Sequence, residues 1–158
     1  MKASSFVVFV AKCIEISYNI WYNINMNNTY KHTKTTVSLI NYHFVFCPRY
    51  RRKIFLIKGL EERFKELTLI ECKKQNIDVL ALECHVDHVH IFVSVLPNHQ
   101  IPLIMKQIKA ATSHVLREEF PVLKAMSSLW TRSYFVSTAG NVSSKTIEWY
   151  VSTQKTRP

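Results

Sequence analysis

Four side chains of this sequence are of types that hold a metal ion or attack phosphorus, and their spacing groups them in two pairs. His88 and His90 lie two apart in an apolar run, and residues at that spacing share one face of a β-strand. Tyr150 and Gln154 lie four apart, which places them on one face of a helix. Imidazole and amide groups bind divalent ions, and a phenol is an oxygen nucleophile. We expect a site that breaks phosphodiester bonds.

The chemistry of these groups supports that interpretation. Three neutral ligands leave the charge of an ion uncancelled, so phosphate oxygens are attracted to it and the scissile phosphate is polarised. A phenol has a pKa of about 10, so Tyr150 needs a metal or a base beside it. Each pair alone has a more ordinary interpretation, because strand histidines are often hydrogen-bonded and a helical tyrosine is often a core residue. The two pairs together favour the site.

Three titratable residues precede the histidine pair and could belong to the same site. Asp87 is next to His88, where its carboxylate would accept a hydrogen bond from a ligand imidazole and orient it. An aspartate in a turn is an equally good interpretation. His85 and Glu83 are near in sequence, but the pattern does not fix where they lie.

Composition and charge point to a nucleic acid as the partner. The chain has 158 residues, 47% of them hydrophobic, as expected for one globular domain. Its 21 Lys and Arg against 11 Asp and Glu give a net charge of +10, which attracts polyanions. Four cysteines without CxxC spacing fit a reduced, cytoplasmic setting.

The beginning of the chain differs from the rest. Its apolar run at 6–11 is interrupted by Lys12 and Glu15, so it is too short for a membrane span, and it is a poor match to a signal peptide. We take residues 1–36 as an N-terminal extension and residues 37–158 as a single domain without a membrane partner.

The hydrophobic pattern predicts the order β-α-β-β-α-β followed by a last helix. The expected strands are 37–47, 77–84, 88–95 and 133–138, with a tight hairpin at 85–87, and the expected helices are 58–75, 101–120 and 145–155. This order is typical of an α+β, ferredoxin-like (split βαβ) fold, an antiparallel sheet with helices on one face. The C-terminal helix carries Tyr150, and the other sheet face is left for a ligand or a second subunit.

Several motifs together resemble those of one family. His-Val-Asp-His-Val-His-Ile-Phe-Val at 85–93 and Thr-Ile-Glu-Trp-Tyr-Val-Ser-Thr-Gln at 146–154 are similar to the motifs of the single-tyrosine HUH transposases of the insertion-sequence 200/605 type. Further agreement lies at 42–43 with 47–53, at 129–136 and at 138–140, so that the resemblance covers about residues 37–155. Val151 stands where the family usually has isoleucine.

The resemblance implies a small dimeric transposase that cuts and rejoins single-stranded DNA with hairpins near the element ends. Tyr150 would form a 5′-phosphotyrosine link, and His88, His90 and Gln154 would hold Mg²⁺ or Mn²⁺. The tyrosine helix would serve the histidines of its own subunit or of its partner. The expected DNA contacts are Arg49, Tyr50, Arg51, Arg52, Lys53, Lys106, Lys109 and Arg117. A solvated charged face is the alternative for these residues.

Three other functions remain open at this point. Another HUH nuclease, such as a replication initiator or a relaxase, often has a larger chain and a third histidine near the pair. A non-catalytic RNA-binding module shares the ferredoxin-like layout and would expose aromatic side chains on its sheet. A zinc hydrolase of small substrates would need neither Tyr150 nor a basic surface.

Overall fold

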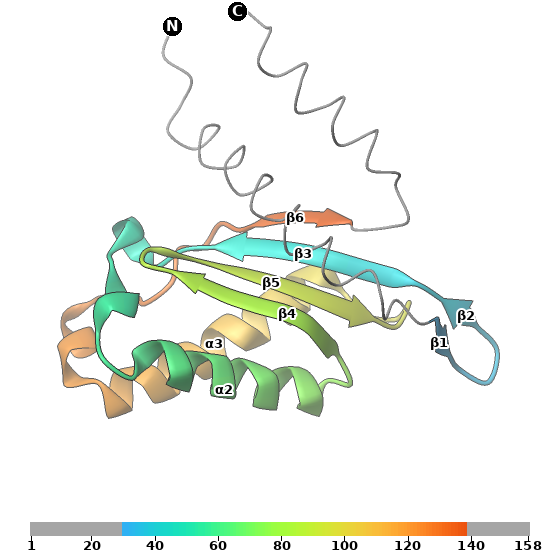
Figure 1. Cartoon of the computed structure of the whole chain (residues 1–158), viewed down its shortest axis with the longest axis horizontal. Coiled ribbons are helices and arrows are strands. Elements are labelled where there is room, and N and C mark those ends of the chain that lie inside the picture. The colour runs from blue at the N-terminus through green and yellow to red at the C-terminus, as the bar shows by residue number, and fades with distance from the viewer. Residues whose placement is uncertain (1–29, 139–158) are drawn as a thin grey trace, which may run out of the picture.

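Four strands form one antiparallel sheet, and two α-helices cover one of its faces (Figure 1). The computed structural model describes residues 30–138. The elements in this range are β1 (Lys31–His32), β2 (Val37–Ser38), β3 (Ile40–Phe46), η2 (Arg49–Arg51), η3 (Ile54–Leu56), α2 (Leu60–Lys74), β4 (Asp78–His85), β5 (His88–Val95), α3 (Ile101–Glu119), η4 (Pro121–Ala125) and β6 (Phe135–Thr138). Strands β1 and β2 pair separately as a small ribbon.

The strand order β4-β5-β3-β6 confirms the predicted fold class. All three neighbouring pairs are antiparallel, and each of the two helices connects strands that are not adjacent in the sheet. This is the split βαβ arrangement, with β5 in the interior of the sheet between β4 and β3. The predicted C-terminal helix at 145–155 lies outside the described residues.

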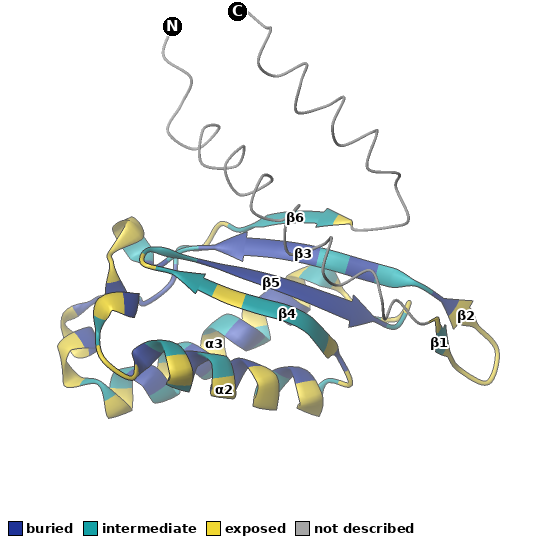
Figure 2. Cartoon of the chain, in the orientation of Figure 1, coloured by how far each residue is buried: buried dark blue, intermediate teal, exposed yellow. Residues whose placement is uncertain are grey.

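The alternation of side chains along β5 divides the sheet into two different faces. Val89, Ile91 and Val93 are buried in the core beneath the helices. His90 and Phe92 point to the opposite face, because successive residues of a strand alternate. They are 1% and 4% exposed, so side chains on this second face are buried as well. Figure 2 shows β5 coloured as buried along most of its length.

The helices pack through the apolar stripes that their spacing predicted. The buried residues are Leu60, Phe64, Leu67, Thr68 and Cys72 of α2, and Ile104, Met105, Ile108, Thr112 and Leu116 of α3. Leu69 and Ile70 also match the apolar pattern, but they are 50% and 43% exposed. Arg63 connects the two helices through two 2.7 Å hydrogen bonds to Glu119.

The hairpin that carries the histidines is tighter than the sequence predicted. Strand β4 continues through His85, which pairs with His88, so only Val86 and Asp87 form the connection. The expectation that His85 lies in the turn is therefore wrong. Connections of two residues are the commonest in hairpins, and this one adds the pair His85–His88 to the ladder.

Between residues 30 and 138, neither helix has the length and apolar character required to cross a bilayer.

Candidate functional site

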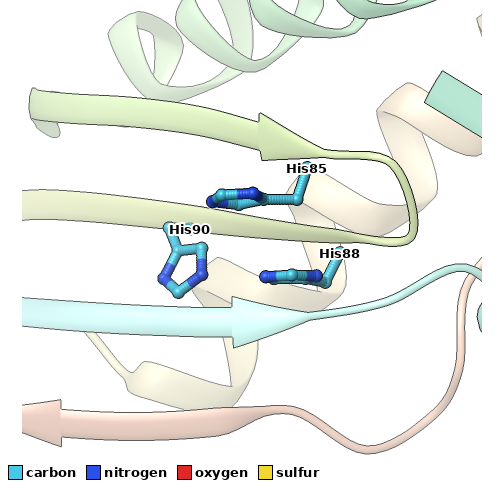
Figure 3. Close-up of side chains that lie close together, drawn as sticks. All are labelled: His85, His88 and His90. Carbon is cyan, nitrogen blue, oxygen red and sulfur yellow. The ribbon is translucent and has the colours of Figure 1, made fainter. Parts of the chain in front are cut away.

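Three imidazoles gather at the end of the β4–β5 hairpin (Figure 3). His85 and His88 are opposite each other in the register, and His90 is opposite Glu83 one pair further along. Residues that are opposite in an antiparallel pair share a face, so the three rings project on the same side of the sheet. One ligand nitrogen from each ring lies within 4.8 Å of the other two. This is a compact group of metal-ligating atoms within one hairpin.

The ring of His88 is oriented by an acidic neighbour. Its Nδ1 lies 2.7 Å from Oδ1 of Asp87. Oδ2 of Asp87 accepts a hydrogen bond from Nε of Arg51 at 3.0 Å and forms an ion pair with Nη2 of Arg51 at 2.8 Å. A carboxylate that accepts from Nδ1–H places the lone pair of the neutral ring on Nε2. Burial raises the pKa of Asp87, but the hydrogen bonds from His88 and Arg51 outweigh this effect and lower it overall. Asp87 is therefore an anion at neutral pH.

The loop that carries Arg51 has an unusual backbone. Tyr50 and Arg51 both have positive φ angles, 60° and 51°, in the left-handed region that side chains disfavour. The loop is tied at its base, where the Arg49 amide donates to the carbonyl of Leu129 at 2.8 Å. Strained backbone of this kind persists only where the surrounding structure fixes it. Here the strained residues bring a guanidinium to Asp87.

A fourth imidazole supports His90 from the neighbouring strand. Nε2 of His43 in β3 lies 3.0 Å from Nδ1 of His90, and the ring of His43 also stacks on Phe92. A neutral imidazole carries one proton, so His90 presents the lone pair of Nε2 only when its Nδ1–H donates to His43. His43 then acts as the acceptor that fixes the tautomer of His90.

Burial keeps these rings uncharged. It lowers the pKa of His43 to about 4. It also lowers the pKa of His90 to about 3, with further lowering by the neighbouring imidazoles His43, His88 and His85. The pKa of His88 is lowered by burial, against the effect of Asp87. Neutral imidazole is the form that binds metals.

Two nitrogens of the cluster are buried without a protein partner. Nε2 of His85 and Nε2 of His90 have no hydrogen-bond partner within residues 30–138. A buried polar atom without a partner costs free energy, and an ion bound between the rings would remove that cost. The donor set, neutral imidazoles beside one carboxylate, fits a divalent metal.

The predicted basic residues lie in different environments. Arg52, Lys53 and Lys106 are exposed, whereas Arg117 is half-buried. The Arg49 guanidinium lies over the ring of Tyr50 at 5.1 Å, and Arg51 forms its ion pair with Asp87. Their contacts with DNA remain predictions.

Lys109 differs from the other basic residues because its ammonium group is used inside the fold. Nζ donates to the carbonyls of Thr131 and Ser133 at 3.0 Å and to that of Arg132 at 3.4 Å. It also lies over the ring of Phe46, and burial lowers its pKa to about 8. The sequence predicted the same role, a DNA contact, for Lys106 and Lys109, but Lys106 is exposed and Lys109 is half-buried.

Sequence reasoning assigned no role to His43, and it did not fix the place of His85. Both depend on strand register, since His43 reaches His90 across the β3–β5 pair and His85 reaches His88 across the β4–β5 pair. The motif at 42–43 was the available signal for His43. Tyr150 and Gln154 lie outside the described residues, so their distances to this cluster are not part of the structure.

Two solved structures of transposases have folds similar to that of this chain. A structure assigned as a transposase of Deinococcus radiodurans R1 superposes with a TM-score of 0.66 at 27% identity, over 78% of this chain and 97% of that one. The REP-associated tyrosine transposase bound to a REP hairpin has a TM-score of 0.53 over 77% of this chain and 67% of its own, and at 12% identity it shows the fold alone. The fold and its histidine hairpin therefore place the chain in the class of transposases.

The sequence comparisons identify the family within that class. The family model described as "Transposase IS200 like" matches residues 36–154. The transposase for insertion sequence element IS200 of Salmonella typhimurium strain LT2 is 33% identical over 117 residues, 72% of this chain and 75% of that protein. The ISDra2 transposase TnpA of Deinococcus radiodurans is 26% identical over 118 residues, 73% of this chain and 84% of that protein. The chain belongs to the IS200-like transposase family, as its motifs predicted.

Proposed function

We propose that this transposase cuts and rejoins single-stranded DNA at the ends of an insertion sequence, with Tyr150 as the nucleophile. The observation that carries the proposal is the pair of neutral imidazoles of His88 and His90 on one face of β5. The family match at 36–154 also includes Tyr150 and Gln154. This match supports a common site for the hairpin and the C-terminal motif.

The proposed step is a transesterification. The phenol oxygen of Tyr150 forms a bond to phosphorus while the bond from phosphorus to the 3′ oxygen breaks. The phenol gives up its proton and the 3′ oxygen takes one up, which leaves a 3′ hydroxyl and a 5′-phosphotyrosine. In the reverse step, another 3′ hydroxyl attacks the phosphotyrosine ester, so that a new phosphodiester bond forms and Tyr150 is released. One phosphate ester replaces another in each direction, so no ATP is needed.

His88, His90 and Gln154 are the residues we propose to hold Mg²⁺ or Mn²⁺. When bound there, the ion would polarise the scissile phosphate and orient it. Asp87 holds the ring of His88, and His43 holds that of His90, so both imidazoles are oriented before an ion arrives.

The proposed DNA partner is single-stranded with hairpin ends. The net charge of +10 attracts a polyanion, and a fold neighbour at 12% identity was solved with a REP hairpin. We further propose that the protein works in the cytoplasm as a homodimer, in which the helix with Tyr150 serves either subunit.

Two alternative functions are less well supported: the burial of the sheet aromatics argues against one, and the family match argues against the other. An RNA-binding module would stack bases on exposed sheet aromatics, but His43 and Phe92, on the sheet face that points away from the helices, are 2% and 4% exposed. A relaxase or replication initiator often has a third histidine, and His85 provides one here. For that second alternative, the family match decides in favour of the transposase.

The proposal is tested with labelled single-stranded oligonucleotides that carry element ends, incubated with the full chain and Mg²⁺ or Mn²⁺. We expect a covalent adduct that survives denaturation and maps to Tyr150. Tyr150→Phe should abolish the adduct while DNA binding is kept, because only the nucleophilic oxygen is removed. Tyr30→Phe is the matched control, since Tyr30 is exposed and lies far from the hairpin in sequence.

Two results would overturn this function. One is the absence of an adduct with every end sequence, from a folded protein shown to bind metal. The other is an adduct of the same yield in the Tyr150→Phe variant.

A further inference from the structure

The end of the β4–β5 hairpin holds one imidazole more than the proposed ligand set uses. His85 is the last residue of β4, and it pairs directly with His88, the first residue of β5. The two rings are stacked, with centroids 4.5 Å apart and planes within 9° of parallel. Figure 3 shows both rings beside that of His90.

The spacing of the three rings is close to that of a metal centre. Nitrogens that bind one ion at about 2.1 Å are at most about 4.2 Å apart. One nitrogen from each of His85, His88 and His90 already lies within 4.8 Å of the others. The His85 and His90 centroids are 5.5 Å apart, and those of His88 and His90 are 5.0 Å apart. Small rotations of the side chains would bring all three nitrogens to one ion.

The buried nitrogens point to the same conclusion. Nε2 of His85 is buried and has no hydrogen-bond partner in the described part of the chain, and the same holds for Nε2 of His90. Native proteins rarely leave a buried polar atom unsatisfied without a reason such as an ion or a water. Two such atoms from facing side chains, beside a third imidazole oriented by Asp87, make a site prepared for a cation.

We propose that His85 is a third protein ligand, so that one hairpin supplies three imidazoles and holds a divalent ion without help from Gln154. The inference deepens the proposed function, because it concerns the same metal site. Gln154 would then be an additional ligand or a contact to the substrate, and the metal would load before the tyrosine helix is in place. Three imidazoles favour Mn²⁺ and later transition ions over Mg²⁺, which prefers oxygen ligands.

The experiment measures the affinity of the full-length protein for Mn²⁺ without DNA. Mn²⁺ is added to the protein, and electron paramagnetic resonance measures the concentration of the ion that remains free. His85→Ala should weaken Mn²⁺ binding by about tenfold or more. Loss of a residue that only supports a metal ligand already costs about tenfold in affinity, and loss of a ligand itself should cost at least as much. Gln154→Ala should weaken binding by less than His85→Ala does, because the three imidazoles remain. His114→Ala is the matched control, because that histidine is 76% exposed on α3 and pairs with Glu118 at 3.6 Å.

A second measurement separates ligation from a structural effect. Pulsed resonance of the bound Mn²⁺ should detect three imidazole nitrogens in the natural chain and two in the His85→Ala variant. Circular dichroism checks that the variant is folded. The inference is overturned if His85→Ala leaves the affinity and the nitrogen signal unchanged while His88→Ala abolishes binding. It is also overturned if Gln154→Ala alone abolishes binding, and in that case the proposed function still stands.

Discussion

His43 shows how much of the site depends on a residue that would not itself touch the ion. Its Nε2 lies 3.0 Å from Nδ1 of His90 and is the acceptor when His90 presents the lone pair of Nε2 to an ion, and its ring contacts both His90 and Phe92. The His43 side chain is 2% exposed, so no solvent molecule replaces it as an acceptor without rearrangement. His43 is therefore a positioning residue for the metal site.

Replacement of His43 by phenylalanine tests this role. His43→Phe keeps an aromatic ring against Phe92 but removes the acceptor, so Nδ1–H of His90 loses its partner. We expect the affinity for Mn²⁺ to fall by about 10- to 100-fold, the range typical of such supporting residues. The unpaired Nδ1–H should also lower the free energy of unfolding without metal by about 1–3 kcal/mol, so the affinity is measured at a temperature where the variant is folded. His43→Gln, which retains an acceptor oxygen, should recover part of the affinity, and equal losses in both variants would contradict the positioning role.

The sequence identified the residues whose role depends on local spacing. His88 and His90 share a face because they are two apart, and Asp87 is adjacent to the ring that it orients. The roles of His43 and His85 depend on which residues of neighbouring strands are opposite each other. A turn one residue longer would have moved His85 out of the ladder, and no pattern within the chain distinguished the two cases.

At the scale of the elements, Lys109 joins α3 to the segment that leads into β6. Its ammonium donates to three consecutive carbonyls, those of residues 131–133. These acceptors lie more than twenty residues further along the chain, which is why the sequence pattern predicted the same role for Lys109 as for the exposed Lys106. The periodicity of a helix predicts its buried side, but it does not show which distant loop supplies a partner to a polar residue.

Lys109 and Lys106 should therefore respond differently to the same change. Lys109→Met keeps the length of the side chain but removes the donor, so the free energy of unfolding should fall by about 1.5–3 kcal/mol. Lys106→Met should leave stability within about 0.5 kcal/mol of the natural chain. If Lys106 contacts a phosphate, its loss should lower DNA affinity and reduce the salt dependence of log K by about one. Urea unfolding and DNA titration at several salt concentrations measure both effects, and equal stability of the two variants would contradict the structural role of Lys109.

For the whole molecule, the buried imidazoles make stability depend on pH. The pKa values of His43 and His90 are lowered to about 4 and about 3, whereas both are near 6.5 in the unfolded chain. Between these values the unfolded chain binds more protons than the folded one, so the free energy of unfolding falls as pH falls below about 6.5. Each histidine contributes up to about 1.4 kcal/mol for each pH unit in that window.

Urea unfolding of the metal-free protein at pH values between about 7 and 4.5 measures this slope. We expect a slope of at least two protons, from His43 and His90 with a further contribution from His88, whose pKa is also lowered. His43→Phe should reduce the slope by about one proton. A slope that is flat over this range would show that the two rings are already accessible to protons in the folded state.

The position of β5 in the sheet has a consequence for how long the imidazoles stay together. The strand is hydrogen-bonded along both sides, to β4 and to β3, so fraying at the margins of the sheet does not reach its ladder with β3. His90 and its acceptor His43 are on these two interior strands and separate only when the central ladder opens. An ion held by His90 therefore opposes denaturation of the entire sheet, and the fraction of protein that is folded increases with the concentration of the ion.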